Sequence, residues 1–407
     1  MYDVSVIGLG RVGLPLALAF ADAGLRVLGI DKDAERLEAV RGKRMPFKEP
    51  GTDELLARVE LDVSARASDA AQSDAIVLTL GTPMLSHIEI DLGDIRAVLD
   101  DLLPVLRADQ LLVLRSTVAP GTTDFVAGYL EKQRGFSAGE DVFVAHVPER
   151  IAADRFLEEI GTLPCIVGGV GEGSGERAAR LFAALGAPIV QTTPVQAELV
   201  KIWTNIMRYT TFALPNLLMM DCERYGANVF DVVELINRDY PRGGMAMPGL
   251  TAGTCLRKDF AFSEEKSNAP GMLLGVSRVH ESVPLFLIDG VKRRLGGSLR
   301  ERKVAVLGLA FKRDTDDERD SLSHKLVRLL ERELADVVIH DPVVATPTAS
   351  FEEAVDGAAV VFVATNHTAF DGALKAIGSD CLVVDPWNAL GAGQVFAFAN
   401  EIAALRA

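Results

Sequence analysis

Residues 3–13 read Asp3-Val4-Ser5-Val6-Ile7-Gly8-Leu9-Gly10-Arg11-Val12-Gly13. A short apolar run leads into a Gly-x-Gly-x-x-Gly turn, and helix-forming residues follow from Leu14 to Ala23. A second apolar run, Arg26 to Ile30, ends at Asp31. This order predicts strand, glycine turn, helix and strand, with an acidic residue at the tip of the second strand. The pattern is typical of a dinucleotide-binding domain.

The glycine turn predicts how a dinucleotide would be held. Gly8 and Gly10 permit the tight turn and close approach of a pyrophosphate, and Gly13 lets the helix pack on the strand. The amides of the helix N-terminus, around Arg11, Val12 and Gly13, favour the pyrophosphate charge. Asp31 is expected to bind the adenosine ribose and repel a 2′-phosphate, which favours NAD over NADP, although Lys32 weakens this preference slightly. The alternative is a Rossmann-like domain that binds no nucleotide.

The sequence that follows this turn predicts a chain of three structural parts. Apolar runs separated by helix-like stretches predict a doubly wound parallel sheet, with further strands at Ala75–Leu80, Leu111–Arg115, Val142–Val147 and Cys165–Gly168. A helical middle follows, with helices from Val195 toward Tyr225, kinked at Pro215, and at Val229–Asn237 and Leu273–Leu295. Strand and helix alternation then resumes, with strands at Val304–Leu307, Val337–Ile339, Val360–Ala364 and Leu382–Asp385.

We therefore expect an α/β protein with two Rossmann-like, doubly wound parallel-sheet domains joined by a central helical domain. The predicted boundaries are 1–190 for the NAD-binding domain, 191–298 for the helical domain, and 299–407 for the second α/β domain. A chain of 407 residues is long enough for two or three such cores.

Composition excludes several functional classes. The net charge of -15 argues against binding to nucleic acid, which depends on Lys and Arg neutralising phosphates. The chain enters a strand at once, without a basic and apolar leader, and has no charge-free apolar run of the ~20 residues that span a bilayer. We therefore expect a cytoplasmic protein with no membrane partner. The four scattered cysteines have no metal-ligand spacing, so we expect free thiols and no metal.

One of these cysteines lies in a distinctive stretch, Pro248-Gly249-Leu250-Thr251-Ala252-Gly253-Thr254-Cys255-Leu256-Arg257-Lys258-Asp259. Small residues before Cys255 would let a substrate carbon approach the sulfur, and Arg257 and Lys258 would favour the thiolate. Asp259 is placed to orient a group or a water. The alternative is a cysteine that serves only as a small buried apolar residue.

With these features, the sequence resembles the UDP-glucose/GDP-mannose dehydrogenase family, and within it the branch that acts on UDP-N-acetylhexosamines. The resemblance covers essentially the whole chain. The matching stretches are Gly8–Gly13, Glu49-Pro50-Gly51 with Glu54-Leu55-Leu56, Gly81-Thr82-Pro83 with Asp91-Leu92, Ser116-Thr117-Val118 with Pro120-Gly121-Thr122, Pro148-Glu149-Arg150, Lys201 with Asn205, Cys255 with Lys258 and Asp259, and Gly308-Leu309-Ala310-Phe311-Lys312 followed by Thr315-Asp316-Asp317 and Arg319.

The resemblance implies oxidation of the C6 hydroxymethyl group of a UDP-hexose to a carboxylate, through a thiohemiacetal and a thioester on Cys255, with two NAD molecules reduced per sugar. Lys201 and Asn205, four residues apart on one helix face, would stabilise an alkoxide or oxyanion; a solvated helix face is the alternative. Either Glu149 or Asp259 would deprotonate the hydrolytic water that Thr117 holds. A strand-end turn with a surface ion pair is the alternative for Pro148-Glu149-Arg150.

The resemblance also implies the remaining contacts. Lys312 and Arg319 would grip the nucleotide end or the sugar, although the acidic residues around Arg319 also fit a structural ion-pair cluster. Arg242 resembles an arginine that reaches across the family's dimer, and a homodimer through the central helices is expected. The predicted substrate contacts are Glu149, Arg150, Lys201, Asn205, Arg242, Gly249, Gly253, Lys312 and Arg319. The predicted cofactor contacts outside the first turn are Thr82, Pro83, Ser116, Thr117 and Lys258.

Three residues depart from the family pattern. Pro215 interrupts the smooth helix expected at the dimer contact. The other two, Thr254 and Arg257, lie where the family often has consecutive glycines before the nucleophile and a proline two residues after it. Thr254 adds bulk beside the thiol, and Arg257 adds a charge; either would affect which sugar fits. Capsule, cell-envelope and secondary-metabolite synthesis all remain open as destinations of the product.

Three other functions are also compatible with the sequence. The first is a UDP-glucose 6-dehydrogenase. The second is a two-electron β-hydroxyacid-type dehydrogenase, which needs neither Cys255 nor the C-terminal α/β domain. The third is a catalytically silent nucleotide-sugar-binding protein.

Overall fold

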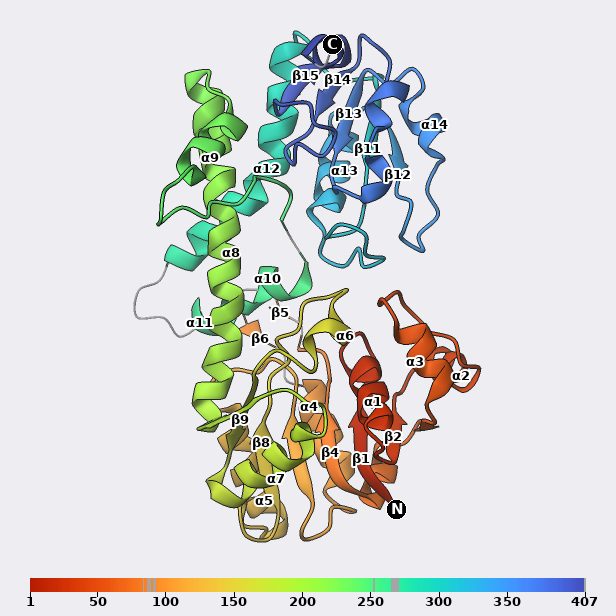
Figure 1. The fold of residues 1–407 in the computed structure, drawn as a ribbon, viewed down its shortest axis with the longest axis vertical. Helices are drawn as coiled ribbons and strands as arrows, with labels where there is room; N and C mark the ends of the chain where they lie inside the picture. The colour runs from red at the N-terminus through yellow and green to blue at the C-terminus, as the bar shows by residue number, and fades with distance from the viewer. Residues whose placement is uncertain (83, 86–88, 91–92, 252, 265–270, 406–407) are drawn as a thin grey trace. The chain divides into compact units, whose positions relative to one another are not determined.

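The computed structural model describes residues 1–82, 84–85, 89–90, 93–251, 253–264 and 271–405 (Figure 1). The chain forms two compact units, Met1–Thr204 with Ala261–Lys266, and Asn205–Phe260 with Ser267–Ala407. Each unit contains one α/β sheet, so the expected fold class is confirmed.

The first unit is built around an eight-stranded sheet in the order β10-β9-β8-β7-β4-β1-β2-β3. The strands are β1 Tyr2–Ile7, β2 Val27–Ile30, β3 Asp62–Ser64, β4 Ser73–Leu78, β7 Leu111–Leu114, β8 Phe143–His146, β9 Cys165–Gly169 and β10 Ile189–Thr192. A separate two-stranded sheet pairs β5 Met84–Leu85 with β6 Glu89–Ile90.

One edge of the large sheet differs from the parallel arrangement expected for Cys165–Gly168. The strands from β3 to β8 are parallel, but β9 pairs with β8 in the antiparallel direction, and β10 follows β9. The connection from β8 to β9 holds only the short helix α6 Phe156–Glu159. A parallel neighbour requires a crossover connection, usually a full helix, and this segment does not supply one.

Alternate strand residues face opposite layers of helices. Val4 and Val6 belong to a core with residues of α1 Gly13–Asp22, α3 Thr52–Arg58 and α7 Gly171–Ala183. Ile76 and Leu78 belong to the opposite core, with residues of α4 Gly93–Leu102 and α5 Thr122–Arg134. Helices on both faces make this sheet doubly wound. The unit also contains α2 Ala34–Arg41, the 3-10 turn η1 Ala67–Gln72 and α11 Ala261–Glu264.

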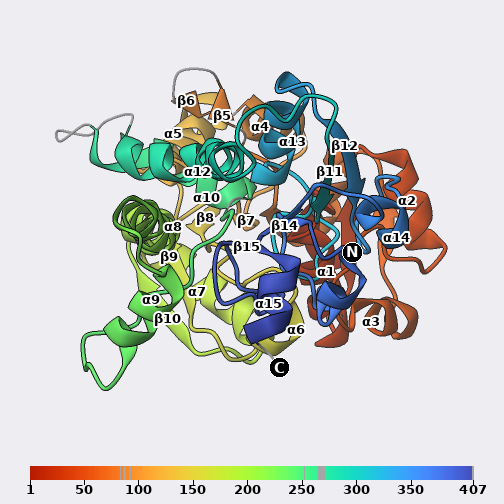
Figure 2. The ribbon, with the colours of Figure 1, turned by 90° about the horizontal axis from the view of Figure 1, so that it is seen from above.

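The long helix α8, Pro194–Tyr225, confirms the predicted central helix. It continues through Pro215 for another ten residues, so the expected kink does not interrupt it (Figures 1 and 2). In the second unit α8 is followed by α9 Val229–Asn237, the short α10 Thr254–Asp259 and α12 Met272–Arg294. No helix among the described residues is long and apolar enough to cross a membrane.

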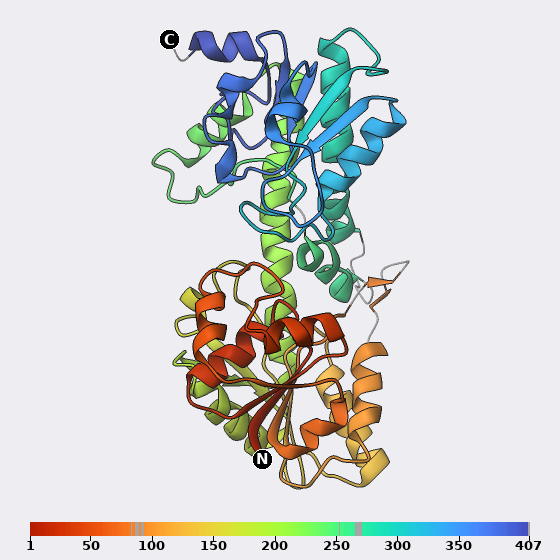
Figure 3. The ribbon, with the colours of Figure 1, turned by 90° about the vertical axis from the view of Figure 1, so that its right-hand side faces the viewer.

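The sheet of the second unit is drawn in cyan to blue in Figure 3. Its five described strands follow the order β12-β11-β13-β14-β15, and only β15 is antiparallel to its neighbour. The strands are β11 Lys303–Leu307, β12 Asp336–His340, β13 Val360–Val363, β14 Leu382–Val384 and β15 Phe396–Phe398. One face packs against α12 and α13 Leu322–Arg332, and the other against α14 Phe351–Val355 and α15 Ala399–Leu405. Two 3-10 turns, η2 Thr368–Phe370 and η3 Ala373–Ala376, complete it.

Candidate active site

The glycine turn after β1 has the geometry that dinucleotide binding requires. Gly8 adopts φ +99°, where a side chain would be strained, and a Cβ on Gly13 would collide with the Gly8 carbonyl oxygen. A Cβ on Gly10 would meet nothing within 4 Å. Gly8 and Gly13 are therefore glycines for structural reasons, whereas Gly10 borders open space that a ligand can enter. The Arg11 guanidinium lies 5.1 Å from the centroid of the Phe47 ring.

Asp31 lies where the ribose acceptor was predicted. Its Oδ2 accepts a hydrogen bond from the Leu9 amide at 2.6 Å and contacts the Arg36 guanidinium at 2.8 Å. Beside it is an open hollow lined by Asp33, Ala34, Glu35, Arg36, Glu38, Ala39, Arg44, Pro46 and Phe47. Lys32 is largely exposed and lies 3.5 Å from Asp94. A ribose hydroxyl that binds Asp31 Oδ2 would have to displace the Arg36 guanidinium or share the carboxylate with it.

Three of the other predicted cofactor residues lie at the carboxyl ends of β4 and β7. The Thr82 hydroxyl donates to the Thr117 carbonyl oxygen at 2.8 Å, and the Ser116 amide donates to the Leu78 carbonyl oxygen at 3.3 Å. The structure thus brings Thr82, Ser116 and Thr117 to one end of the sheet, where ligands bind in open α/β folds. Pro83, and the Asp91-Leu92 match, lie outside the described residues.

Glu149 forms a buried ion pair rather than the surface pair considered from the sequence. Its Oε2 lies 2.6 Å from Arg115 Nη2, and its Oε1 accepts from the Ile151 amide at 2.7 Å. The side chains of Arg115 and Glu149 are only 5% and 12% exposed. Arg150 donates to the Pro164 carbonyl oxygen at 3.3 Å, which fixes the following loop.

Lys201 lies in the first unit near two groups that the sequence did not indicate. Burial, with smaller contributions from the positive charges of Arg115 and Lys201, lowers the pKa of His146 to about 3. His146 is fully buried at the end of β8, and neither of its ring nitrogens has a hydrogen-bond partner among the described residues. A neutral imidazole therefore lies beneath the cationic groups at this end of the sheet.

Glu198, one turn before Lys201 on α8, anchors the loop that contains Thr117. It is buried, and its oxygens accept hydrogen bonds from the Gly121 amide at 2.7 Å and from the Thr123 amide and hydroxyl at 2.8 and 2.6 Å. These bonds cap the N-terminus of α5. Glu198 thereby ties the loop 116–122 to the turn of α8 that carries Lys201.

The stability of this anchor should depend on pH. Burial raises the pKa of Glu198 above its usual 4.5, although hydrogen bonds from Thr123 and Gly121 oppose the shift. A raised carboxyl pKa stabilises the fold fully below pH 4.5, and this contribution is lost as the pH rises through the folded-state pKa. Relative to Glu198→Gln, the wild type should therefore lose free energy of unfolding between pH 4.5 and 7. Urea denaturation of both proteins across this range measures the difference; parallel pH profiles would contradict the prediction.

In the second unit, three predicted residues form one buried cluster. Asn205 Nδ2 donates to Asp259 Oδ2 at 2.6 Å, and Lys258 Nζ donates to Asp259 Oδ1 at 2.9 Å. Asn205, Lys258 and Asp259 are 5%, 8% and 0% exposed. Asn205 was predicted to act beside Lys201, but its amide nitrogen is bonded to Asp259.

Cys255 is exposed on the first turn of the same short helix, α10, that carries Lys258 and Asp259. Gly253, just before it, adopts φ +100°, and a Cβ there would approach the Phe311 ring to 2.6 Å. Only glycine therefore fits between the cysteine loop and the loop that begins at Gly308. The exposed thiol excludes the alternative of a buried apolar cysteine.

A buried polar chain holds the other end of the cysteine loop. Asn216, fully buried on α8, accepts from the Gly249 amide at 2.8 Å and donates to the Gly249 carbonyl oxygen at 3.0 Å. His280 of α12 lies 3.4 Å from the Asn216 amide nitrogen and 2.9 Å from the Tyr209 carbonyl oxygen. A Cβ on Gly249 would strike the Trp387 ring. Gly249 is thus explained by packing, and its predicted substrate contact stays a prediction.

Arg257 does not point its charge freely toward a substrate. Its Nη2 lies 2.6 Å from Glu281 Oε1, and its Nη1 donates to the Asp320 carbonyl oxygen at 3.0 Å. Lys325 binds the other Glu281 oxygen at 2.8 Å. The residue that departs from the family pattern therefore ties α10 to α12 and to the loop before α13.

The loop after β11 carries the two other cationic residues predicted for the substrate. Arg319 forms a bidentate ion pair with Asp317: its Nε donates to Oδ1 at 2.8 Å and its Nη2 donates to Oδ2 at 2.7 Å. The Arg319 side chain is nevertheless 64% exposed. The bond to Asp317 raises the pKa of Arg319, and the nearby Cys255 and Asp320 raise it slightly more. Lys312 is half-buried in the same loop. Arg242 is exposed and lies against Tyr240, apart from this group.

Three models of one protein family match successive parts of the chain. The model of the UDP-glucose/GDP-mannose dehydrogenase family NAD binding domain matches residues 2–186, the central domain model residues 195–281, and the UDP binding domain model residues 305–392. No group of three or more His, Cys, Asp or Glu residues that could hold a metal ion occurs among the described residues.

Individual relatives span nearly the whole chain. A UDP-N-acetyl-D-mannosamine dehydrogenase of Pyrococcus horikoshii is 32% identical over 378 residues, which cover 90% of each chain. An NDP-N-acetyl-D-galactosaminuronic acid dehydrogenase of Ralstonia nicotianae is 30% identical and covers 90% of this chain and 91% of its own. Among solved structures, a UDP-D-ManNAc dehydrogenase from Pyrococcus horikoshii has a TM-score of 0.88 at 31% identity, covering 94% of each chain.

Proposed function

The chain belongs to the UDP-glucose/GDP-mannose dehydrogenase family, and from this premise we propose that it oxidises C6 of a UDP-N-acetylhexosamine to a carboxylate in two stages. It is an NAD-dependent nucleotide-sugar dehydrogenase. The observation that carries the proposed mechanism is the exposed Cys255 one turn before the buried Lys258–Asp259 pair, whose carboxylate binds Asn205.

The glycine turn and Asp31 fit NAD. The open space beside Gly10 admits a pyrophosphate, and Asp31 offers a carboxylate to the ribose once Arg36 moves. Thr82, Ser116 and Thr117 would line the rest of the cofactor site at the carboxyl end of the sheet. When bound, NAD accepts a hydride from the sugar carbon at each of the two oxidation stages.

Cys255 divides the four-electron oxidation into manageable steps. After the alcohol has become an aldehyde, the thiolate adds to C6 and forms a thiohemiacetal. Loss of the second hydride gives a thioester, and water releases the carboxylate and restores the thiol. The balance is RCH2OH + 2 NAD⁺ + H2O → RCOO⁻ + 2 NADH + 3 H⁺. Lys201 and Asn205 supply donors for the oxyanions that form in these steps.

The hydrolytic base is one of two carboxylates. Both oxygens of Glu149 accept hydrogen bonds from Arg115 and the Ile151 amide, and both oxygens of Asp259 accept from Asn205 and Lys258. Each would have to share a lone pair with the water that Thr117 holds. We keep both as candidates.

A UDP-N-acetylhexosamine is the proposed substrate because relatives with this chemistry in their names match nearly the whole chain at about 30% identity. The alternative is UDP-glucose, since a UDP-glucose dehydrogenase from Pyrobaculum islandicum has a TM-score of 0.85 at 30% identity. The UDP binding domain model at residues 305–392 argues against a two-electron β-hydroxyacid dehydrogenase, which has no need for that part of the chain.

The domain division 1–190, 191–298 and 299–407 is supported by the three family matches, whose limits fall within these ranges. We further propose a homodimer through α8. Exposed apolar residues recur along it at spacings of three, four and seven, namely Val200, Trp203, Met207, Leu214 and Leu217. Sedimentation equilibrium of the purified chain decides this point: a monomer at micromolar concentration would refute it.

The experiment that tests the function is NADH release from a panel of UDP-GlcNAc, UDP-ManNAc, UDP-GalNAc and UDP-glucose. We expect two NADH per sugar consumed and a higher kcat/KM for an N-acetylated sugar than for UDP-glucose. One NADH per sugar with an aldehyde product would rule out the thioester route. Binding of NAD and UDP-sugar without any NADH would favour a silent binding protein.

A further inference from the structure

The turn after β11 in the second unit repeats the geometry of the NAD-binding turn. Gly308 adopts φ +97°, close to the +99° of Gly8. The Leu309 amide donates to Asp341 Oδ2 at 2.6 Å, the distance that also separates the Leu9 amide from Asp31 Oδ2. Asp341 follows β12 as Asp31 follows β2. The second unit therefore has an acidic residue at the position that corresponds to Asp31, the proposed ribose acceptor of the first unit.

Asp341 differs from Asp31 because hydrogen bonds from the protein occupy all the acceptor sites of its carboxylate. Its Oδ2 accepts from the Leu309 and Ala310 amides and from His367 Nε2, the latter two at 3.1 Å. Its Oδ1 accepts from the Val343 and Val344 amides at 2.8 and 3.1 Å. A carboxylate has about four lone-pair sites, and five donors occupy them. No acceptor is left for a ribose hydroxyl, so this carboxylate serves the protein's own loops.

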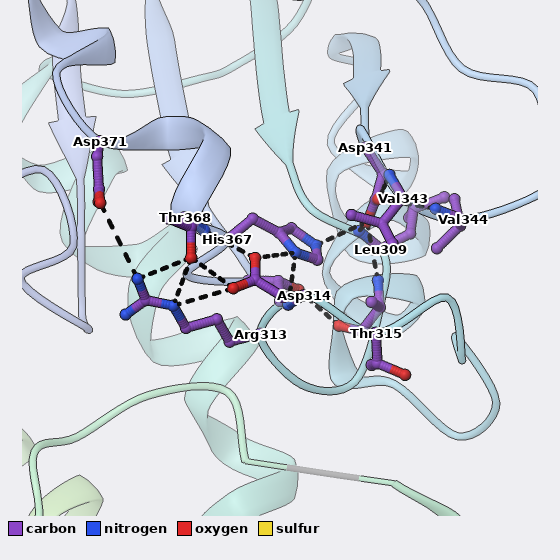
Figure 4. Close-up of polar contacts among 12 residues, drawn as sticks. Leu309, Arg313, Asp314, Thr315, Asp341, Val343, Val344, His367, Thr368 and Asp371 are labelled. Carbon is purple, nitrogen blue, oxygen red and sulfur yellow. Dashed lines mark hydrogen bonds and ion pairs between the residues drawn. The ribbon is translucent and has the colours of Figure 1, made fainter. Parts of the chain in front are cut away.

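His367 is the side-chain donor that completes this set (Figure 4). It is 1% exposed, and its Nδ1 accepts from the Asp314 amide at 2.9 Å. Because a backbone amide only donates and the Asp341 carboxylate only accepts, the imidazole is neutral with its proton on Nε2. Burial opposes a low pKa at Asp341, but the His367 and amide hydrogen bonds hold that pKa below its usual range.

The contacts of His367 join two points of one loop. Through Asp341 it fixes Leu309 and Ala310, and directly it fixes Asp314. Asp314 adopts φ +58°, an unfavourable conformation for a residue with a side chain. Its carboxylate also accepts from the amide of Thr368 at 2.8 Å and from the Thr368 hydroxyl (Figure 4). The strained turn is therefore held from the segment 367–368.

Lys312 and Arg319, the predicted substrate cations, lie on this same loop. Lys312 is flanked by the two fixed points, Ala310 and Asp314, and the loop closes where the Phe311 amide donates to the Asp317 carbonyl oxygen at 2.9 Å. Asp317 in turn holds Arg319 by the bidentate ion pair. A change at His367 thus reaches both cations through backbone contacts.

We propose that His367 is a positioning residue that holds the loop 308–319 in the conformation that binds the nucleotide part of the substrate. The inference rests on the proposed function for the identity of the ligand. It adds that Asp341 and His367 of the second unit hold this loop, whereas Asp31, the corresponding carboxylate of the first unit, is proposed to bind a ribose.

UDP binding to the full-length chain, measured by calorimetry without NAD, is the primary test. His367→Ala removes both ring contacts and should weaken UDP binding roughly tenfold through lost pre-organisation. The KM for the UDP-sugar should rise by a similar factor, while the KM for NAD and the kcat should stay within about threefold. A merely destabilised protein would show the same KM values as the wild type for its folded fraction.

Two conservative variants keep the test valid if His367→Ala does not fold. His367→Gln can place its NH2 group near Asp341 but has no acceptor at the position of the histidine Nδ1, whereas His367→Asn can accept from the Asp314 amide but is too short to reach Asp341. Each should bind UDP with an affinity between those of the wild type and the alanine variant. His340→Gln, which alters a histidine bonded to the Ala349 carbonyl oxygen, is the control and should bind UDP normally.

The outcomes separate the two proposals. If folded His367 variants bind UDP as tightly as the wild type, the positioning role is wrong while the proposed function stands. If the wild type itself binds no UDP, the nucleotide-sugar assignment of the substrate fails first.

Discussion

Replacing Cys255 with serine is expected to lower kcat for complete oxidation by roughly 10⁴-fold, since loss of a nucleophile removes the covalent route. A serine hydroxyl ionises far less readily than a thiol, so it adds to the C6 aldehyde too slowly to sustain the second oxidation. Because Cys255 is exposed, the substitution should leave folding unchanged and affect only the chemical steps. Stopped-flow and steady-state NADH release with UDP-N-acetylhexosamines measure it.

Cys165→Ser is the matched control, because Cys165 is half-buried in β9 and has no proposed role. It should retain the wild-type rate. In the wild type, the UDP-sugar should protect Cys255 from alkylation by iodoacetamide, as followed by peptide mass spectrometry. Wild-type turnover in Cys255→Ser, with two NADH per sugar, would end the thioester mechanism and reopen a thiol-independent dehydrogenase.

The features that could be predicted from the sequence are those set by local spacing. Gly8, Gly10, Gly13 and Asp31 lie within one strand-helix-strand unit, so their geometry follows from short-range constraints. The long helix α8 is predicted from Thr193, which can cap a helix, from Pro194 at the first helical position, and from the helix-like stretch that follows. Strand direction at β9 was not, since it depends on the path of the connection and on pairing with a distant strand.

The sequence does not predict hydrogen-bond and ion-pair partners that come from distant segments of the chain. Helical spacing placed Asn205 on the same face as Lys201, but its bond to Asp259 depends on how α10 packs on α8. Arg115, Glu198, Asn216 and His367 carry no local motif, because each is recognisable only by what it touches. Arg257 illustrates the same limit: the sequence shows a charge beside the thiol, and the structure shows Glu281 engaging it.

Replacing Asp259 with asparagine should lower both stability and activity. The new amide must turn its NH2 group toward either Asn205 Nδ2 or Lys258 Nζ, and both of these are donors. The change also removes the carboxylate that contacts a buried ammonium, with side-chain exposures of 11% for Lys258 and 0% for Asp259. We expect a loss of about 3 kcal/mol in the free energy of unfolding.

Activity should fall with stability because Asp259 orients Asn205. Once released, the Asn205 amide no longer points reliably at a forming oxyanion, and kcat should drop by about 10²-fold. Urea denaturation gives the first quantity, and NADH release under conditions where the variant is fully folded gives the second. Measuring both separates the loss of catalytic geometry from the loss of folded protein.

Asp22→Asn makes the same exchange in an exposed ion pair and serves as the control. Asp22 and Arg58 are 43% and 61% exposed, so the exchange should cost less than about 1 kcal/mol. The two variants should differ because of burial. Water can solvate Arg58 once the Asp22 charge is lost, whereas Asp259 is fully buried and Lys258 would keep a poorly solvated charge. If Asp259→Asn were as stable and as active as Asp22→Asn, the cluster of Asn205, Lys258 and Asp259 would be neither a structural anchor nor part of the chemistry.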